Sequence, residues 1–295
     1  MSKAGDAVER VTSTQEYKQL IRCNKSRFEK TDTNCFLMSR GMEPYIQQGR
    51  LFVRQFPEGM AMYVDEGSYY ELYYFWNSRA PMADLRRDKP VSLVEVDEGG
   101  KRGAYLAGME RKLFTAGFCV LKDTCQVEMN PCDPAHRLKE SLALDQARMA
   151  DEGLRFHYDD GSNLPRAVEL WREYLDLADV PLDHTSLKPE DKLLCVMSKD
   201  DRLAAVHWWR HTGKFSEGRH TVTHPDYYRR GLASAMLRAW CLDAKERGIS
   251  KAATWIRTTN YKSLALYRKV GFVPNGRVSR QYILKEPLNK SSYGV

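Results

Sequence analysis

The chain alternates between segments with a strand pattern and segments with a helix pattern, and it does so in two similar passes. Residues 154–286 contain a strand pattern, a helix pattern at 165–178, a hairpin pattern and a strand broken at Pro225. They continue with a helix ended by Gly248, another strand, a helix opened by Asn260 and ended by Gly271, and a last strand. Residues 50–129 contain three strand patterns, followed by a strand, a loop, a helix and a strand. This alternation predicts an α/β (α+β) fold in which helices flank a sheet.

A long amphipathic helix is expected between the two passes, within residues 132–153. Asp133 and Pro134 are typical helix-starting residues, and Gly153 is a typical stop. We therefore expect an N-terminal lobe at residues 1–131, a helical connector at 132–153 and a C-terminal domain at 154–295.

The composition is that of a protein with a sizeable core. The chain has 295 residues, of which 42% are hydrophobic, and this length suits one large or two ordinary domains. It contains no apolar run of membrane-spanning length, and its first residues lack the apolar stretch of a secretory signal. We expect a soluble, cytoplasmic protein that does not act at a membrane.

The cysteines and histidines do not follow a metal-binding pattern. Seven cysteines are spread along the chain without a C-x-x-C pair, and the seven histidines show no H-E-x-x-H spacing. We expect reduced thiols and no metal cofactor.

The positive charge is concentrated near the C-terminus. The formal net charge is +7, and residues 219–295 hold 15 Lys and Arg but only 4 Asp and Glu. Such a bias is typical of a solvated basic face, of nucleic-acid binding or of a site for an anionic ligand. The charge count does not decide among these three.

A turn within this basic segment has the form of an anion site. After the strand that ends at Pro225, Arg229 and Arg230 precede Gly231, and a helix is expected to begin near Gly231. The first N–H groups of a helix have no partner inside it, and the helix dipole favours negative charge there. Small residues at 231 and 233 let a phosphate approach the backbone, although such a turn is also a common structural feature.

Two sequence motifs identify a family. "HPDYYRRGLA" (224–233) resembles the acetyl-CoA loop of the GCN5-related N-acetyltransferases (GNATs), which has the pattern Gln/Arg-x-x-Gly-x-Gly/Ala. "NYKSLALYRKVGF" (260–272) resembles the second signature of the same family. The resemblance implies two GNAT-like lobes, each with a mixed, mostly antiparallel central sheet flanked by helices. It also implies acetyl-CoA as co-substrate, although Tyr228 stands where the family has Gln or Arg.

The resemblance implies a set of coenzyme-binding positions. The backbone of Val222 and Thr223 is expected to pair with the pantetheine amides like an added strand. The amides of the loop, with Arg229 in place of the missing side chain at 228, are expected to hold the pyrophosphate. The full set comprises Val222, Thr223, Tyr228, Arg229, Arg230, Gly231, Leu232, Ala233, Asn260, Ser263, Tyr267 and Lys269.

Acyl transfer to an amine needs a base for the amine and an acid for the departing thiolate. The resemblance makes Tyr267 the general acid; packing at the i+3 position from Leu264 is the structural alternative. The base is expected on the strand before the loop, where Glu217 and His220 are both candidates. His220 titrates near neutral pH, whereas Glu217 fits the family's position better. Either residue is also compatible with an exposed strand end.

The first pass resembles a degenerate lobe of the same kind. Its loop at 97–103 contains Lys101 and Arg102 but no Gly-x-Ala step after an Arg or Gln, and an alternative match of "KLFTAGF" to "LYRKVGF" places Leu113 where Tyr267 stands. On either alignment this lobe lacks a general acid. We interpret it as a support and acceptor-binding surface, as in two-lobed members of the superfamily in which the second lobe works.

The sequence does not identify the acceptor substrate. Aromatic residues at 69–76 and 206–211 are able to line a cleft, but alternating strand aromatics are more often core residues. Small amines, amino acids, aminoglycoside-like compounds, peptides and protein lysines are all compatible. Two other function classes remain: an aminoacyl-tRNA-dependent transferase of the Fem type, which would use the basic segment for tRNA, and a non-catalytic acetyl-CoA-binding sensor. Of these partners, nucleic acid is the one that the nearly intact loop disfavours.

Overall fold

The computed structural model of the chain describes residues 8–27, 30–35, 39–100, 103–175 and 190–285. The chain divides into two compact units. Unit 1 comprises Met1–Asp123 and Val278–Val295, and unit 2 comprises Thr124–Arg277. The strands β7 (Cys119–Met129) and β13 (Val273–Leu284) each run from one unit into the other.

Unit 1 is a mixed sheet with helices. Its strand order is β1-β3-β4-β5-β6, followed by the C-terminal part of β13, and all of its pairs except the parallel β5–β6 pair are antiparallel where the register is defined. The remaining elements are β1 (Glu9–Arg10), α1 (Thr14–Lys25), β2 (Thr31–Thr33), α2 (Ser39–Gln47), β3 (Leu51–Phe56), β4 (Gly59–Asp65), β5 (Tyr70–Asn77), β6 (Val91–Glu98) and α3 (Gly103–Thr115).

Three elements of unit 1 were not predicted from the sequence. The helix α2 contains Pro44, which weakens a helix pattern, and the strands β1 and β2 have only two and three residues. The three long strand patterns between residues 50 and 77 are confirmed as β3, β4 and β5.

Unit 2 has the strand order β13-β7-β12-β11-β10-β9-β8. All pairs with a defined register are antiparallel except β11–β12, which is parallel. The sheet is therefore mixed and mostly antiparallel, as expected. Its elements are η1 (Pro134–His136), α4 (Leu138–Asp151), β8 (Leu154–Asp159), α5 (Leu164–Tyr174), β9 (Asp191–Ser198), β10 (Leu203–Thr212), β11 (Phe215–Thr223), η2 (Pro225–Tyr227), α6 (Leu232–Glu246), β12 (Lys251–Arg257) and α7 (Tyr261–Val270).

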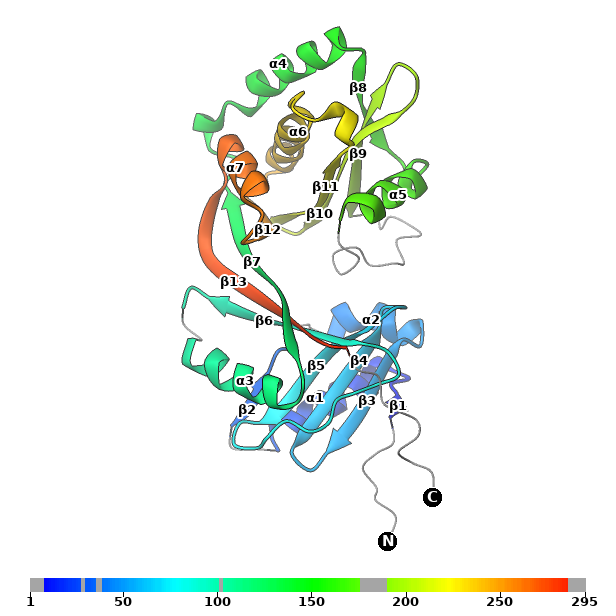
Figure 1. Ribbon diagram of the computed structural model, residues 1–295, viewed down its shortest axis with the longest axis vertical. Helices are drawn as coiled ribbons and strands as arrows, with labels where there is room; N and C mark the ends of the chain where they lie inside the picture. Colours follow the sequence, from blue (N-terminus) through cyan, green and yellow to red (C-terminus); the bar gives the residue numbers. More distant parts are fainter. Residues whose placement is uncertain (1–7, 28–29, 36–38, 101–102, 176–189, 286–295) are drawn as a thin grey trace. The chain divides into compact units, whose positions relative to one another are not determined.

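Helices cover both faces of the unit 2 sheet (Figure 1). Helices α4, α6 and α7 lie on one face, with Trp209, Trp240 and Phe272 among the residues of their core. Helix α5 lies on the other face, where Trp171 packs against Trp208. The α6 sequence is rich in Ala and Leu, and nine of its fifteen residues are buried, so this helix forms the centre of its layer.

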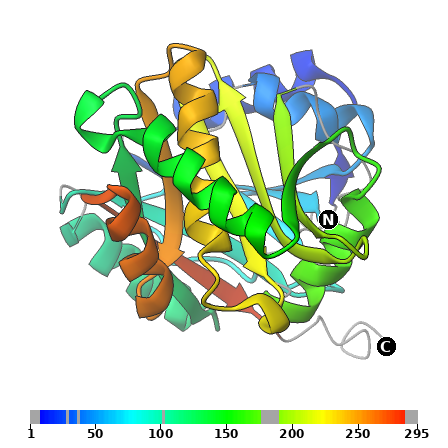
Figure 2. The same ribbon diagram turned by 90° about the horizontal axis from the view of Figure 1, so that it is seen from above.

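The helical connector belongs to unit 2. Helix α4 crosses over α6 (Figure 2), and Asp145 of α4 forms an ion pair with Arg238 of α6. Residues 278–295, in contrast, are grouped with unit 1. The observed division thus differs from the expected boundaries at 131/132 and 153/154, because β7 and β13 extend across the chain's two units and no local pattern marks that crossing.

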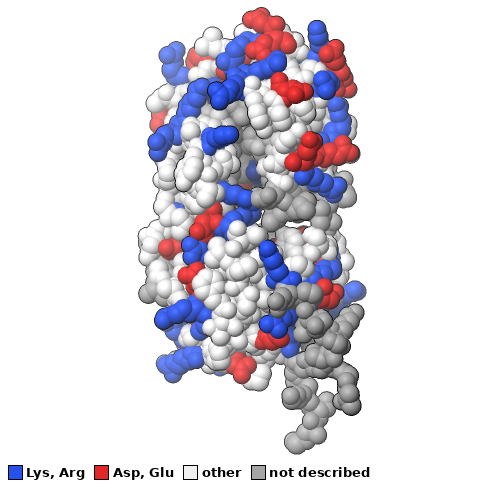
Figure 3. All heavy atoms as spheres, in the orientation of Figure 1, with Lys and Arg blue, Asp and Glu red and all other residues white. Residues whose placement is uncertain are grey.

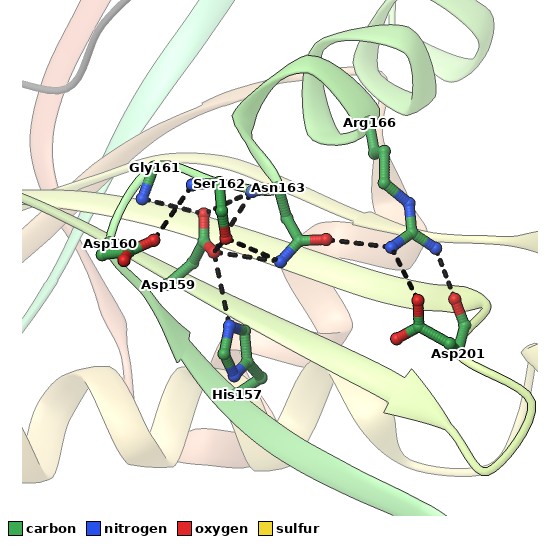
Figure 4. A network of polar contacts seen from close by, with 8 residues as sticks. All are labelled: His157, Asp159, Asp160, Gly161, Ser162, Asn163, Arg166 and Asp201. Carbon is green, nitrogen blue, oxygen red and sulfur yellow. Dashed lines mark hydrogen bonds and ion pairs between the residues drawn. The ribbon is translucent and has the colours of Figure 1, made fainter.

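The loop between β8 and α5 is held by one carboxylate (Figure 4). Asp159 accepts hydrogen bonds from the N–H groups of Gly161 and Asn163 and from the hydroxyl of Ser162, at 2.8–3.2 Å. Burial raises the pKa of Asp159, but these hydrogen bonds outweigh it and the net pKa is lowered. The carboxylate therefore fixes the start of α5. The last residues expected in this helix, 176–178, lie outside the described part of the chain.

Among the residues that the structure describes, none of the helices combines the length and the apolarity needed to span a membrane.

Candidate active site

The edge of β11 opens next to the predicted loop. Strands β11 and β12 pair in parallel only from Phe215 to Glu217, opposite Lys251 to Ala253. Both strands continue beyond these residues, so β11 from Gly218 onward has no paired strand on its β12 side. This absence of a partner strand holds for the described residues of the chain. On the other side of β11, Val222 and Thr223 pair with β10. An open strand edge of this kind is able to pair with the amides of an extended ligand.

A β-bulge in β11 sets the direction of the side chains beside this opening. Trp208 of β10 stands opposite both Arg219 and His220, because the register shifts between His207 and Trp209. As a result Gly218 and Thr221 face the same side: a β-carbon at Gly218 would meet Trp240 of α6, and Thr221 contacts Tyr267 of α7.

The predicted loop is a tight turn that ends on a left-handed glycine. The N–H of Tyr227 donates to the carbonyl of His224, and the N–H of Tyr228 donates to that of Pro225. Arg229 and Gly231 then both have positive φ, at 62° and 78°. A positive φ at Gly231 explains the need for glycine there, and Arg229 adopts a left-handed conformation that residues with a side chain rarely take.

The helix α6 begins with free backbone donors. Its first hydrogen bond runs from the N–H of Ala235 to the carbonyl of Gly231 at 3.1 Å, so the N–H groups of Leu232, Ala233 and Ser234 precede the helical ladder. The side chain of Leu232 is buried in the core while its backbone lies in the turn. The first turn has no acidic side chain. The arrangement fits an anion at this end of α6.

A further cation at the turn comes from the connector helix. The guanidinium group of Arg148, in the last turn of α4, lies where a β-carbon at Gly231 would project. Asp145 holds this guanidinium at 3.1 Å and also pairs with Arg238. The sequence analysis missed Arg148, because no local pattern relates α4 to the turn at Gly231.

The side chains of the turn itself are exposed. Tyr228 has an exposed fraction of 56%, and Arg229 is exposed as well. Arg230 reaches back to the end of α4 and pairs with Glu152 at 3.4 Å. Tyr228, which stands where the GNAT pattern has Gln or Arg, therefore points its side chain into solvent and does not pack into the turn.

Acidic residues from earlier in the chain offset part of the C-terminal basic excess. Four basic residues of the segment 219–295 pair with acidic residues before 153, and these pairs are Arg230–Glu152, Arg238–Asp145, Lys251–Glu128 and Arg280 with Glu110 and Asp123. Figure 3 shows basic and acidic side chains interspersed on the face that it presents. Ion pairs within each unit therefore neutralise part of the positive charge of residues 219–295.

Tyr267 lies in the core with its hydroxyl toward β11. Its exposed fraction is 5%, its ring packs edge-on against Phe272, and its hydroxyl lies 3.5 Å from that of Thr221. Burial raises the pKa of Tyr267 to about 12, although hydrogen bonds with Thr221 and Thr254 lower it. The hydroxyl is therefore protonated at neutral pH, as a proton donor must be.

The two candidate bases lie on the α5 side of β11. His220 packs against both rings of the stacked pair Trp171 and Trp208, with centroid distances of 5.3 and 5.4 Å. Glu217 forms an ion pair of 3.0 Å with Arg219, whose guanidinium lies over Trp208. The side chains of both candidates thus face away from the layer that contains Tyr267.

Asn260 caps α7. Its side-chain oxygen accepts a hydrogen bond from the N–H of Ser263 at 3.0 Å. Its amide nitrogen stays available for a ligand, and the residue is exposed. Lys269 is exposed in the last turn of the same helix, opposite to the Asn260 end.

In unit 1, the chain itself fills the corresponding opening. Strands β5 and β6 pair in parallel at Tyr70 and Glu71 only, much as β11 and β12 do. Further along β5, residues Phe75–Asn77 pair with the short strand β2. The side chain of Asn34 bonds to the backbone of Leu72 and Tyr74, both at 2.9 Å. The edge that is open in unit 2 is thus occupied in unit 1.

Unit 1 also lacks the helix that would carry an anion turn. Residues 78–90 join β5 to the parallel strand β6 without a helix, whereas α6 joins β11 to β12. In the order of elements, α3 of unit 1 therefore corresponds to α7 of unit 2. This correspondence supports the alignment in which the fully buried Leu113 is equivalent to Tyr267. Lys101 and Arg102 lie outside the described residues.

Comparison with known proteins identifies the family of unit 2. Residues 159–272 match the acetyltransferase (GNAT) family model. This segment is a GNAT-family domain. It contains the open β11 edge, the turn at Gly231 and Tyr267, whereas Arg148 lies outside it.

Relatives and solved structures agree with the GNAT assignment. The chain is 36% identical over 80 residues to the mycothiol acetyltransferase of Clavibacter sepedonicus, a match that spans 27% of this chain and 26% of the relative. A GCN5-related N-acetyltransferase from Sphaerobacter thermophilus has a TM-score of 0.54 at 12% identity, covering 97% of this chain and 98% of its own. A glucosamine N-acetyltransferase region of a fungal multi-domain β-N-acetylglucosaminidase has a TM-score of 0.53 at 12% identity, covering 90% of this chain and 34% of its own. These two structures show a GNAT-like fold.

Proposed function

We propose that unit 2 transfers an acetyl group from acetyl-CoA to a primary amine of a small molecule or peptide, by direct attack in a ternary complex. The observation that carries this proposal is the open edge of β11, which ends directly before the free N–H groups of α6. The open edge suits the extended pantetheine chain, and the N–H groups that follow it suit the pyrophosphate at the end of that chain. The name of the matched relatives, mycothiol acetyltransferase, supports the same reaction class.

The coenzyme would lie along β11 and end on the turn. The backbone of Val222 and Thr223 pairs with the pantetheine amides, and the amides from Arg229 to Ala233 hold the pyrophosphate. Arg148 adds a guanidinium at the same place. Asn260 and Ser263 orient the pantetheine from the start of α7, and Lys269 serves the outer phosphate.

Tyr267 supplies the proton that the departing sulfur needs. Its raised pKa keeps the hydroxyl protonated, and its burial keeps water from competing for the sulfur. The amine loses its proton to Glu217 or to His220. Because both lie on the α5 side of β11, we propose that the acceptor enters from that side, opposite to the acid.

Unit 1 is proposed to support the fold and to bind the acceptor rather than a second coenzyme, since its strand edge is filled by β2 and Asn34. We further propose a cytoplasmic location, because all seven cysteines are free thiols and such thiols fit a reducing compartment.

Calorimetric titration of acetyl-CoA into the wild-type chain and the Gly231→Glu variant tests the function. The variant places bulk and negative charge in the turn, and it should lose binding. Gly248→Glu is the matched control, since Gly248 also has positive φ, at the opposite end of α6, with open space around it. This control should bind acetyl-CoA as the wild type does.

Release of free CoA thiol with a panel of amines then separates the function classes. Turnover with at least one amine supports the acetyltransferase. Acetyl-CoA binding without turnover on any amine would point to a sensor. Salt-dependent tRNA binding without acetyl-CoA binding would point to a Fem-type transferase instead.

A further inference from the structure

A buried histidine is joined to Tyr267 through one hydroxyl group. His207 of β10 stands opposite Thr221 of β11, and its Nδ1 lies 2.7 Å from the Oγ1 of Thr221. The same Oγ1 lies 3.5 Å from the hydroxyl oxygen of Tyr267. Three elements, β10, β11 and α7, therefore contribute one residue each to a chain of buried polar groups.

The ring of His207 is neutral. The residue is fully buried, and the rings of Trp209 and Trp240 lie against it at centroid distances of 5.3 Å. Burial lowers its pKa to about 3, against a hydrogen bond with the backbone of His220. The imidazole therefore carries a single N–H at neutral pH.

The position of that hydrogen follows from the surroundings of the ring. The Nε2 atom is buried and has no hydrogen-bond partner among the described residues. A buried N–H without an acceptor is rarer in proteins than an unused lone pair, so the hydrogen belongs on Nδ1. Nδ1–H then donates to the oxygen of Thr221 and is shared with the backbone of His220.

The hydrogen of Thr221 is consequently available for Tyr267. A hydroxyl has one hydrogen, and the oxygen of Thr221 already accepts from His207. Thr254, the other hydroxyl near Tyr267, donates its own hydrogen to the carbonyl of Gly218 at 2.7 Å. Thr221 is therefore the hydroxyl of this pair that is able to donate to Tyr267.

We propose that His207 is a positioning residue for the acetyl transfer, acting through Thr221 to orient the hydroxyl of Tyr267. Nδ1–H of His207 donates to Thr221, and Thr221 donates to the oxygen of Tyr267. Tyr267 accepts this hydrogen bond, so its own hydrogen is not used on Thr221 and can be donated to the sulfur that departs from the acetyl group. This inference rests on the proposed function, and it adds a residue that never touches the coenzyme.

The proton balance of the step is simple. The bond between sulfur and the acetyl carbon breaks as the amine nitrogen bonds to that carbon. The amine nitrogen gives its proton to Glu217 or His220, and the O–H of Tyr267 protonates the thiolate. The hydrogen bond from Thr221 stabilises the phenolate that remains until solvent returns the proton. His207 and Thr221 keep their own protons throughout.

Four variants test this arrangement through kcat for acetyl transfer and KM for acetyl-CoA. His207→Leu and Thr221→Val each break the chain, and each should lower kcat at least tenfold with KM within twofold of the wild type. His207→Asn keeps an N–H donor near the Nδ1 position and should retain most of kcat. The double variant His207→Leu with Thr221→Val should be no slower than the slower single variant, because the chain is already broken.

Ser216→Ala is the matched control. Ser216 lies on the same face of β11 and accepts a buried hydrogen bond from Trp240 at 2.7 Å, but it is not part of the chain to Tyr267. It should lower the melting temperature and leave kcat unchanged. An unchanged kcat in Thr221→Val, or equal losses in His207→Asn and His207→Leu, would overturn the proposal. Failure of the wild type to release CoA thiol would instead remove the proposed function itself.

Discussion

The guanidinium group of Arg148 occupies the place where a β-carbon at position 231 would project, so that any side chain at Gly231 would collide with the arginine. The contact joins the end of α4 to the start of α6. It places a positive charge beside the free N–H groups of α6, where a pyrophosphate is proposed to bind.

Arg148→Ala should therefore weaken binding of acetyl-CoA about tenfold, the effect of losing roughly 1.4 kcal/mol of a charge-assisted contact. Binding of acetylated pantetheine, which lacks the pyrophosphate, should not change. Calorimetry with both ligands measures this difference. Lys139→Ala, an exposed residue in the first turn of α4, is the control. Equal affinity of wild type and Arg148→Ala for acetyl-CoA would show that Arg148 only packs against the turn.

Tyr267→Phe should lower kcat about a hundredfold, the usual effect of losing a general acid, while the affinity for acetyl-CoA stays unchanged. The ring remains, so its edge-on contact with Phe272 persists and the fold is preserved. Steady-state kinetics and calorimetry on the same preparation separate the two quantities. A kcat equal to that of the wild type would assign Tyr267 to the core alone.

Glu217→Gln and His220→Gln should distinguish the candidate bases. Loss of the base removes the acidic limb of the kcat/KM profile, because no group then needs to be deprotonated for activity. The rate should fall in only one of the two variants. Profiles from pH 5 to 9 for both, with melting curves as a check on His220 against its two tryptophans, provide the measurement. If both variants keep the acidic limb, the base lies elsewhere.

Each chain should bind one acetyl-CoA. The open edge and the anion turn occur in unit 2, whereas in unit 1 the residues Thr31–Thr33 and Asn34 occupy the edge of β5. Calorimetry should give a stoichiometry of one, and Gly231→Glu should abolish all binding. A stoichiometry of two, or a second site that survives in Gly231→Glu, would contradict the self-filled edge of unit 1.

Glu71 should make the stability of unit 1 depend on pH. Burial raises the pKa of Glu71 to about 7 in the folded chain, against 4.5 for an ordinary glutamate, despite a hydrogen bond with Tyr73. Its favourable contribution is complete below pH 4.5 and is lost as the pH rises toward 7, because the unfolded chain then releases a proton that the folded chain retains.

Glu71→Gln should accordingly raise the free energy of unfolding at pH 8 by up to about 3 kcal/mol and leave it unchanged at pH 4. Denaturant unfolding at both pH values measures this. Glu43→Gln, an exposed residue of α2, is the control. Equal effects of Glu71→Gln at the two pH values would show that folding does not raise the pKa of Glu71.

Much of the fold was predictable because its signals are local. The stops at Gly153, Gly248 and Gly271 have the positive φ that favours glycine, and Asn260 caps α7 as its position before the helix pattern indicated. The break at Pro225 ends β11 at Thr223. Helix α2 escaped prediction because Pro44 disguises it, and β2 because three residues are too few to form a pattern.

By itself, the sequence determined the order of the longer helices and strands apart from α2, the turn at Gly231 and the motif that contains Tyr267, since each depends on residues that are neighbours in the chain. Only the tertiary structure decided that Arg148 meets Gly231, that His207 reaches Tyr267 through Thr221, and that β2 fills the edge of β5. These contacts join residues far apart in the chain. They follow from strand pairing and helix packing, whose geometry no short segment encodes on its own.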